Sequence, residues 1–156
     1  MNDISPVNYD VIAPRYDARY AQNPLAGVSR ELRTLVSISQ ARDVLEVGCG
    51  TGHWVIELFP LVRRIVGLDF SFGMLEQARA QNDALLLTNG DANLLPFPSA
   101  SFDLVLSLNA LQHYTDPRAF ISEARRLLRR TVRSPSSIWT RILGATNGIS
   151  TIISKA

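Results

Sequence analysis

Short apolar runs alternate with segments of helical spacing along most of this chain. The runs that predict buried strands are residues 43–48, 64–69, 84–88 and 102–108. Helical periodicity and capping residues predict helices over 24–39, 53–61, 71–81 and 116–130. Residues 1–23 are expected to be irregular, with Tyr9, Tyr16 and Tyr20 making them locally aromatic. Strands that alternate with helices indicate an α/β domain with a parallel sheet covered on both faces.

The pattern changes after Arg130. The segment TVRSPSSIWTRILGATNGISTIISKA is rich in Ser, Thr and Ile and has no strong strand signal. Its isoleucines fall near helical spacing, but Gly144, Gly148 and β-branched residues weaken a helix. A membrane-surface helix over the isoleucine stretch 138–153 is disfavoured, because Arg141 is the one positively charged residue in that stretch. We therefore divide the chain into a cap segment and helix (1–40), a core (41–130) and a poorly ordered tail (131–156).

Charge and cysteine content limit the partners and the cellular compartment that can be expected. All fourteen acidic residues lie at or before Glu123, so the net charge of +2 comes from a basic end and does not indicate nucleic-acid binding. A single cysteine, Cys49, cannot form an internal disulfide, which favours a reducing compartment. Neither a signal peptide nor an apolar run of roughly 18 residues is visible. The expected location is the cytoplasm, without membrane attachment.

The stretch VLEVGCGTGHW, residues 44–54, carries the strongest chemical signal. Glycines after a strand let a ligand approach the main chain, and the following helix offers unpaired N–H groups. Asp69, at the end of the next predicted strand, is placed to accept hydrogen bonds from ribose hydroxyls. The dinucleotide fingerprint G-x-G-x-x-G fails, because His53 stands at its third glycine. The carboxylate of Glu46 within the strand instead suits a ligand with a cationic end, such as an amino-acid ammonium group.

This stretch resembles the first motif of the class I S-adenosylmethionine-dependent methyltransferases. The segment VGLDFSFGMLEQAR resembles their second strand and the helix that follows it. The segment GDANLLPFPSASFDLVLSLNALQHYTDPRAFISEARRLLR resembles the third and fourth motifs of their small-molecule branch, and YDVIAPRYDARYA resembles the segment that folds over the cofactor. The resemblance covers about residues 7–130. It implies a Rossmann-like three-layer sandwich, S-adenosyl-L-methionine as cofactor and a small-molecule methyl acceptor.

The resemblance also implies roles for individual residues. The glycines would let the methionine part of the cofactor lie against the main chain, with Glu46 as its anchor, and Asp69 would bind the ribose. Cys49 lies among these glycines as a small residue with no expected redox role. The full cofactor-binding set implied is Tyr16, Glu46, Gly48, Cys49, Gly50, Gly52, Asp69, Phe70, Met74, Asp91, Ala92, Leu108 and Asn109.

The remaining members of that set have roles at the other parts of the cofactor. Phe70 and Met74 would flank the adenine, and the carboxylate of Asp91, beside Ala92, would accept a hydrogen bond from its exocyclic amine. Leu108 and Asn109 would lie near the transferred methyl group. Tyr16 would be a contact from the covering segment.

Methyl transfer from a sulfonium needs mainly correct placement of the acceptor, so no catalytic triad is expected. A general base is required only if the acceptor loses a proton. His113, after the fourth predicted strand, is the candidate base, although a structural role is the more common one at such a position. No metal ligand set is predicted.

The chain departs from the family pattern after the last predicted helix. Family members continue with a turn of the Pro-Gly-Gly type and three more strands, in the sheet order 3-2-1-4-5-7-6, whereas RTVRSPSSIW follows here. We expect a sheet ordered 3-2-1-4 that lacks the later strands and leaves the fourth strand as an open edge. Three readings stay open: a methyltransferase with an incomplete acceptor site, a truncated or frameshifted product without activity, and a non-enzymatic subunit that pairs with a partner strand or a second copy at the open edge.

Overall fold

The computed structural model describes residues 7–22, 26–129, 138–145 and 148–155. Within these residues, the strands form one sheet in the order β3-β2-β1-β4-β6-β5. The parallel strands are β1 (Asp43–Val47), β2 (Arg64–Asp69), β3 (Leu86–Asn89) and β4 (Leu104–Leu108). The predicted α/β Rossmann-like class and the strand order 3-2-1-4 are confirmed, although β3 begins two residues later than predicted.

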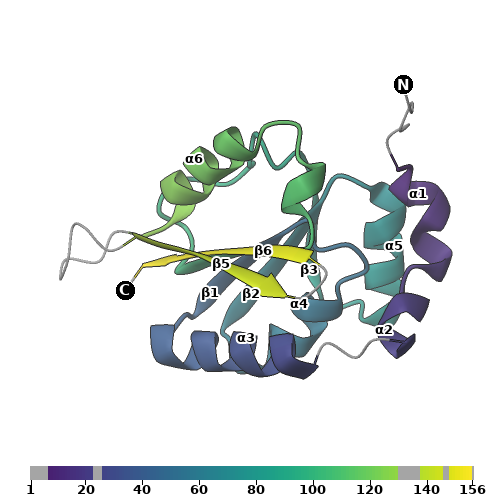
Figure 1. The fold of residues 1–156 in the computed structure, drawn as a ribbon, viewed down its shortest axis with the longest axis horizontal. Coiled ribbons are helices and arrows are strands. Elements are labelled where there is room, and N and C mark those ends of the chain that lie inside the picture. Colours follow the sequence, from purple (N-terminus) through teal and green to yellow (C-terminus); the bar gives the residue numbers. More distant parts are fainter. Residues whose placement is uncertain (1–6, 23–25, 130–137, 146–147, 156) are drawn as a thin grey trace.

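Helices cover both faces of this sheet (Figure 1). One face carries α3 (Ala26–Ser39), α4 (His53–Leu58) and α5 (Phe72–Gln81), and the other carries α6 (Pro117–Leu127). The 3-10 turns η2 (Phe59–Leu61) and η3 (Leu111–His113) follow α4 and β4. Because successive strand residues point to opposite faces, Val44 packs in the core beneath α3 and α4 whereas Leu45 packs in the core beneath α6. The result is the predicted three-layer sandwich.

Side-chain caps place the helix starts where the sequence predicted them. The hydroxyl of Ser71 accepts a hydrogen bond from the N–H of Met74 at 3.1 Å. A carboxylate oxygen of Asp116 accepts from the N–H groups of Arg118 and Ala119 at 2.9 and 3.1 Å. At its other end α6 is three residues shorter than predicted, because the chain after Leu127 turns to pair with the segment before β4.

The N-terminal segment is more regular than predicted. It contains α1 (Tyr9–Ile12), η1 (Ala13–Arg15) and α2 (Ala18–Gln22). The side chain of Asn8 caps α1, and Pro14 falls in the first turn of η1, where a missing N–H is tolerated. The prediction of irregular structure was wrong because proline at such a position starts a helical turn instead of breaking one.

The final segment forms two strands, which corrects the prediction of a poorly ordered tail. They are β5 (Ile138–Ala145) and β6 (Gly148–Lys155), an antiparallel pair separated by two residues. Strand β6 pairs antiparallel with β4, from Leu104 opposite Ser154 to Leu108 opposite Ser150. Thus later strands are present, β4 is not an open edge, and the site proposed there for a partner strand is filled by the chain itself. The rest of the predicted tail, 131–137, 146–147 and 156, lies outside the described residues.

Two physical causes account for this correction. The backbone N–H and C=O groups along the outer side of β4 need partners, and a second strand supplies them. The β-branched Ile and Thr residues that weaken a helix in this segment favour an extended chain. The order also differs from the family order 3-2-1-4-5-7-6, because the neighbour of β4 here is β6 and not the next strand along the chain. None of the described helices is long and apolar enough to cross a bilayer.

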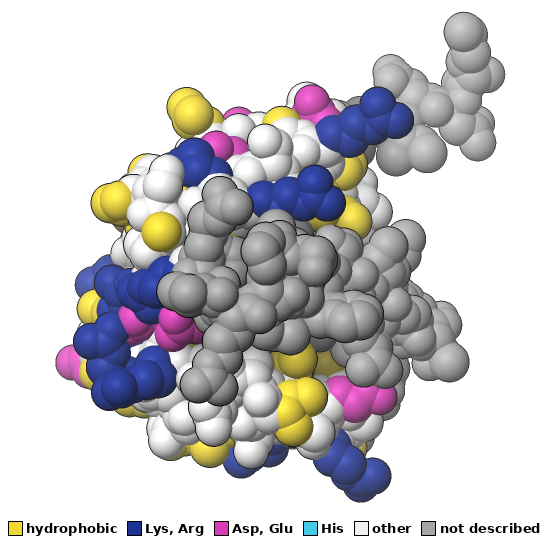
Figure 2. Space-filling view, turned by 90° about the vertical axis from the view of Figure 1, so that its left-hand side faces the viewer, with side chains coloured by type: hydrophobic (Ala, Val, Ile, Leu, Met, Phe, Trp, Pro, Cys, Tyr) yellow, Lys and Arg dark blue, Asp and Glu magenta, His cyan; other side chains and the backbone are white. Residues whose placement is uncertain are grey.

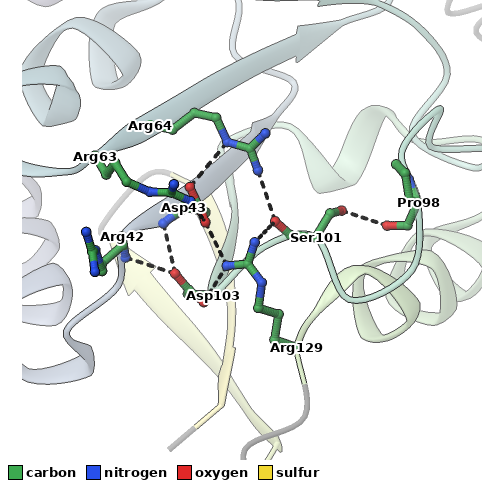
Figure 3. A network of polar contacts seen from close by, with 8 residues as sticks. All are labelled: Arg42, Asp43, Arg63, Arg64, Pro98, Ser101, Asp103 and Arg129. Carbon is green, nitrogen blue, oxygen red and sulfur yellow. Dashed lines mark hydrogen bonds and ion pairs between the residues drawn. The ribbon is translucent and has the colours of Figure 1, made fainter.

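An ion-pair network joins the amino-terminal ends of the strands (Figure 3). Asp43, which begins β1 and is 1% exposed, pairs with Arg63, Arg64 and Arg129. Burial raises the pKa of Asp43, but hydrogen bonds from Arg63 and Arg129 outweigh it and hold that pKa below its usual value. Asp103 accepts the N–H of Asp43 at 2.9 Å and pairs with Arg129 at 2.8 Å. Basic side chains gather beside acidic ones on this side of the molecule (Figure 2).

Candidate functional site

A cavity of about 580 Å³ lies at the carboxyl ends of the parallel strands, opposite the ion-pair network. Its size is typical of a site for a small organic ligand. The implied site residues that line it are Tyr16, Glu46, Gly48, Cys49, Gly50, Asp69, Phe70, Met74, Asp91, Ala92, Leu108, Asn109 and His113. Gly52 is the member of the implied set that is not part of the lining.

The glycine loop, residues 48–52, connects β1 to α4. Gly48 has φ of 73°, and a Cβ built on it would lie 2.4 Å from the Cβ of Ala110. Gly52 has φ of 81° and directly precedes α4, where a Cβ would lie 3.0 Å from the Cβ of Ala78. Gly48 therefore lets the loop pass close beneath the end of β4, and Gly52 lets α4 pack against α5 without touching the cavity.

Asp69 holds two loops together at the end of β2. One carboxylate oxygen accepts the N–H of Gly50 at 2.7 Å, and the other accepts the N–H of Ser71 at 2.9 Å. Burial raises the pKa of Asp69 despite these hydrogen bonds. A carboxylate has about four lone-pair sites, so Asp69 can still accept a hydrogen bond from a ligand in the cavity.

Glu46 is the most unusual group in the cavity wall. Its side chain is 1% exposed, and its Oε2 has no hydrogen-bond partner among the described residues. Burial, and then the nearby charge of Asp69, raise its pKa well above the usual value. Among the described lining residues there is no lysine or arginine. A buried carboxylate in such surroundings is costly unless a cation meets it, so the cavity suits a ligand with a positive charge.

Other implied residues of the cavity wall differ in exposure and conformation. Phe70 is 80% exposed, whereas Met74 is buried. Asp91 accepts the N–H of Asn93 at 2.8 Å within an exposed turn. Asn109 directly follows β4 and lies in the left-handed region, with φ of 56°, a conformation that is uncommon for residues other than glycine and clusters at functional sites.

Residues 7–22, here called the strap, are fastened over the cavity. A carboxylate oxygen of Asp10 accepts hydrogen bonds from the hydroxyl of Ser71 at 2.6 Å and from the N–H of Gly73 at 2.8 Å. The hydrogen bond from Ser71, and to a smaller extent the one from Gly73, lowers the pKa of Asp10. Asp17 accepts hydrogen bonds from the hydroxyl of Thr51 and from the side-chain amide of Gln81. The strap is thus joined both to the start of α5 and to the glycine loop.

His113 meets the strap at the far end of the cavity. Its Nε2 lies 2.9 Å from the hydroxyl of Tyr9 and 3.2 Å from the side-chain nitrogen of Gln112. The ring is exposed and forms an edge contact with Tyr9, with centroids 5.4 Å apart. A ring nitrogen at the cavity wall can take a proton, but here it also helps to hold the strap.

Sequence reasoning missed several residues of the cavity wall. Tyr9 and Tyr20 line it together with Tyr16, and their shared aromatic segment was the signal that could have found them. Tyr114 also lines it, donating to the Val47 carbonyl at 2.8 Å and contacting the hydroxyl of Ser107 at the same distance. Burial raises the pKa of Tyr114, so it stays a neutral phenol. No local pattern signals Tyr114, because its partner on β1 is distant in the sequence.

Comparison with known proteins places the chain in a family. A family model described as a methyltransferase domain matches residues 45–133, more than half of the chain. The malonyl-[acyl-carrier protein] O-methyltransferase of Hahella chejuensis is 42% identical over 114 residues, which cover 67% of this chain and 40% of that protein. The demethylmenaquinone methyltransferase of Lactiplantibacillus plantarum is 34% identical over 138 residues, which cover 80% of this chain and 58% of that protein.

The fold has a counterpart among solved structures. A crystal structure of a protein from Methanococcus maripaludis matches with a TM-score of 0.74 at 17% identity, covering 99% of this chain and 97% of that one. At this identity the similarity shows the fold alone.

The chain spans 40% and 58% of the lengths of the two relatives above. The matched region 45–133 contains the glycine loop, Asp69 and the end of β4. The chain therefore belongs to the class I S-adenosylmethionine-dependent methyltransferases.

Proposed function

We propose that this protein transfers a methyl group from S-adenosyl-L-methionine to a small-molecule acceptor. The observation that carries the proposal is the buried carboxylate of Glu46, whose Oε2 has no hydrogen-bond partner among the described residues and which lines a cavity with no described lysine or arginine in its lining. When bound, S-adenosyl-L-methionine supplies an electrophilic methyl group. The similarity to named methyltransferases supports the reaction class.

The cavity residues fit the parts of this cofactor. Glu46 would meet the ammonium group of its methionine part, and the glycine loop, with Cys49, would lie against the same part. Asp69 would accept hydrogen bonds from the ribose hydroxyls with the lone-pair capacity that the N–H groups of Gly50, Phe70 and Ser71 leave free. Tyr16 would close over these groups from the strap.

The adenine and methyl ends have their own residues. Exposed Phe70 and buried Met74 would lie on the two sides of the adenine, with Asp91 and Ala92 at its edge. Leu108 and Asn109 would place the acceptor next to the methyl group. The names of the two relatives specify different acceptors, a malonyl group on an acyl-carrier protein and demethylmenaquinone. We therefore assign the acceptor only as a small molecule that enters near His113.

Isothermal titration calorimetry with S-adenosyl-L-methionine tests the proposal, and the Glu46→Gln variant tests its main observation. We expect wild type to bind and the variant to bind about tenfold or more weakly, because a charge-assisted contact to the ammonium group is lost. Glu31→Gln, on the exposed part of α3, is the control. Absence of binding by wild type contradicts the proposal, and equal binding by both proteins contradicts the role of Glu46.

Glu46→Gln is expected to weaken cofactor binding but to stabilise the ligand-free protein. Because the pKa of Glu46 is raised in the folded state, wild-type stability falls as the pH rises through that raised pKa. Glu46→Gln removes the buried charge, so we expect the variant to be more stable than wild type at pH 8 and to differ less at pH 5. Urea unfolding followed by circular dichroism measures both differences. A variant less stable than wild type at pH 8 would contradict this sign.

His113 is proposed as the base for acceptors that must lose a proton. With a phenolic acceptor, we expect His113→Ala to lower the rate of S-adenosylhomocysteine formation about 100-fold. The dissociation constant of S-adenosyl-L-methionine should rise far less than the rate falls, since Asp10 and Asp17 still fasten the strap when its contact with His113 is lost. Unchanged turnover in the variant would mean that His113 serves only to hold the strap.

A further inference from the structure

The sheet ends in two edge strands of different length. One edge is β3, which has four residues, and the other is β5, which has eight and belongs to the yellow hairpin in Figure 1. β5 pairs with β6 residue by residue, from Ile138 opposite Lys155 to Ala145 opposite Gly148. No described strand pairs with its outer side. In an antiparallel pair, every second residue directs its N–H and C=O groups away from the partner, so half of β5 presents these groups outward.

The β5 edge lacks the features by which soluble proteins usually prevent edge pairing. It is long, and its described pairs with β6 contain no bulge. Its sequence, IWTRILGA, has no proline and one charged residue, Arg141, and its Ile, Trp and Thr residues favour strands. The β3 edge is limited by its four residues. β5 is therefore the edge that is suited to pair with a further strand.

We propose that β5 pairs with β5 of a second copy of this chain, so that two sheets join into one across a two-fold axis. An axis perpendicular to the sheet makes the two strands antiparallel and keeps corresponding faces on the same side. This single operation covers both eight-residue edges and leaves the short β3 at each end of the joined sheet. A strand from another protein would cover one β5 and expose a new edge of its own, so the edge favours a second copy.

The sequence of β5 selects the register of this pairing. Directly opposite residues must lie on the same face, so the residue on the two-fold axis is Arg141 or Ile142 when nearly all of β5 is paired. With Arg141 on the axis, two like charges would lie directly opposite each other, which is destabilising. With Ile142 on the axis, Arg141 lies opposite Leu143 of the second copy. The pairing is therefore centred on Ile142.

The two cavities lie away from this interface. β5 runs parallel to β4, because β6 is antiparallel to both. The strands of the second copy therefore run in the opposite direction, and the cavities at their carboxyl ends lie at opposite ends of the strands in the joined sheet. The inference is thus independent of the cofactor proposed for the cavity.

Disulfide trapping on the whole chain tests the register. Opposite Cα atoms in an antiparallel pair are about 4.5–5.5 Å apart, within the range of about 4.4–6.8 Å that a disulfide spans. Ile142→Cys should therefore form a covalent dimer under mild oxidation, which a non-reducing gel detects. Thr140→Cys is the matched control on the same face, because its two copies would be four residues, or about 13 Å, apart along the paired strands.

Wild type, in which the single cysteine Cys49 is buried, gives the background of this experiment. We expect a covalent dimer from Ile142→Cys and none above background from Thr140→Cys. Absence of the Ile142→Cys dimer, or equal cross-linking of both variants, would overturn the pairing centred on Ile142.

Size-exclusion chromatography with light scattering measures the pairing without a cross-link. At about 100 μM, which populates a dimer with a micromolar dissociation constant, wild type should have twice the mass of one chain. Ile142→Lys places two ammonium groups opposite each other and should raise the dimer dissociation constant about fivefold or more. Cooperative urea unfolding shows that this variant is folded. A monomeric wild type, or a folded variant that dimerises as wild type does, would overturn the proposal and leave the proposed methyl transfer unaffected.

Discussion

Replacing Asp69 by alanine is expected to weaken binding of S-adenosyl-L-methionine about 100-fold or more. Two effects combine in this variant. The ribose hydroxyls lose a charged acceptor, and hydrogen bonds to charged groups contribute about 1.5–3 kcal/mol each. The N–H groups of Gly50 and Ser71 also lose the carboxylate that joins their loops, so the cavity wall is less well ordered before binding. Calorimetry with the purified variant measures the loss.

The control for this experiment is Glu76→Ala. Glu76 is exposed on α5, the helix that follows Asp69, and is not part of the cavity lining. The substitution Glu76→Ala removes one carboxylate, as Asp69→Ala does, but from the helix that follows Asp69. Its cofactor affinity should therefore stay within about twofold of wild type. An Asp69→Ala protein that unfolds cooperatively and binds within threefold of wild type would show that Asp69 does not hold the ribose.

The second large effect is on stability, at the opposite end of the strands. Asp43→Asn leaves three arginines without their shared buried carboxylate. Breaking a buried pair by removing one partner costs about 3–5 kcal/mol, and the partial exposure of these arginines reduces the expected loss to about 2–3 kcal/mol. Urea unfolding at pH 7 measures this loss, with Asp83→Asn on an exposed turn as the control.

The pH dependence gives this prediction a second test. The pKa of Asp43 is lowered in the folded protein, so its contribution to stability is complete above the ordinary aspartate pKa of about 3.9. The contribution is lost as the pH falls through the lowered value, where wild type also becomes protonated. The difference between wild type and Asp43→Asn should therefore be constant above about pH 4 and shrink as the pH falls below that value. A difference that does not shrink below about pH 4 would show that the cost comes from altered packing.

The core of the fold and most of the site could be predicted because their signals are local. A strand ending in glycines, an acidic residue at the end of the next strand and a capped helix each occupy a short window, and parallel strands bring their carboxyl ends together. Glu46 and Asp69 meet at one cavity for this reason. His53 at the position of the dinucleotide glycine was equally informative, and the structure gives it a contact of its own with Tyr20.

What could not be predicted depends on partners that are far apart in the sequence. Taken alone, the segment after Arg130 has only weak propensity for a helix and for a strand. The unpaired backbone groups along β4 favour the strand, because a neighbouring strand supplies their hydrogen-bond partners. Tyr114 lines the cavity because of its hydrogen bond to Val47, which no spacing reveals. Tyr9 differs from Tyr114, because its aromatic segment was a local signal, and only its contact with His113 depends on a residue far away in the sequence.

The antiparallel pairing of β6 with β4 has a consequence for how such a protein can diverge. Because the pair runs in opposite directions, Ser150, near the start of β6, lies opposite Leu108 at the carboxyl end of β4. The hairpin of β5 and β6 therefore lies beside β4, while the glycine loop lies on the other side of β4. Under the proposed function, sequence changes in this hairpin would alter the side of the site next to the proposed acceptor and leave the residues proposed to bind the cofactor at the ends of β1 and β2 in place. The proposed acceptor side and the proposed cofactor side could then diverge separately in evolution.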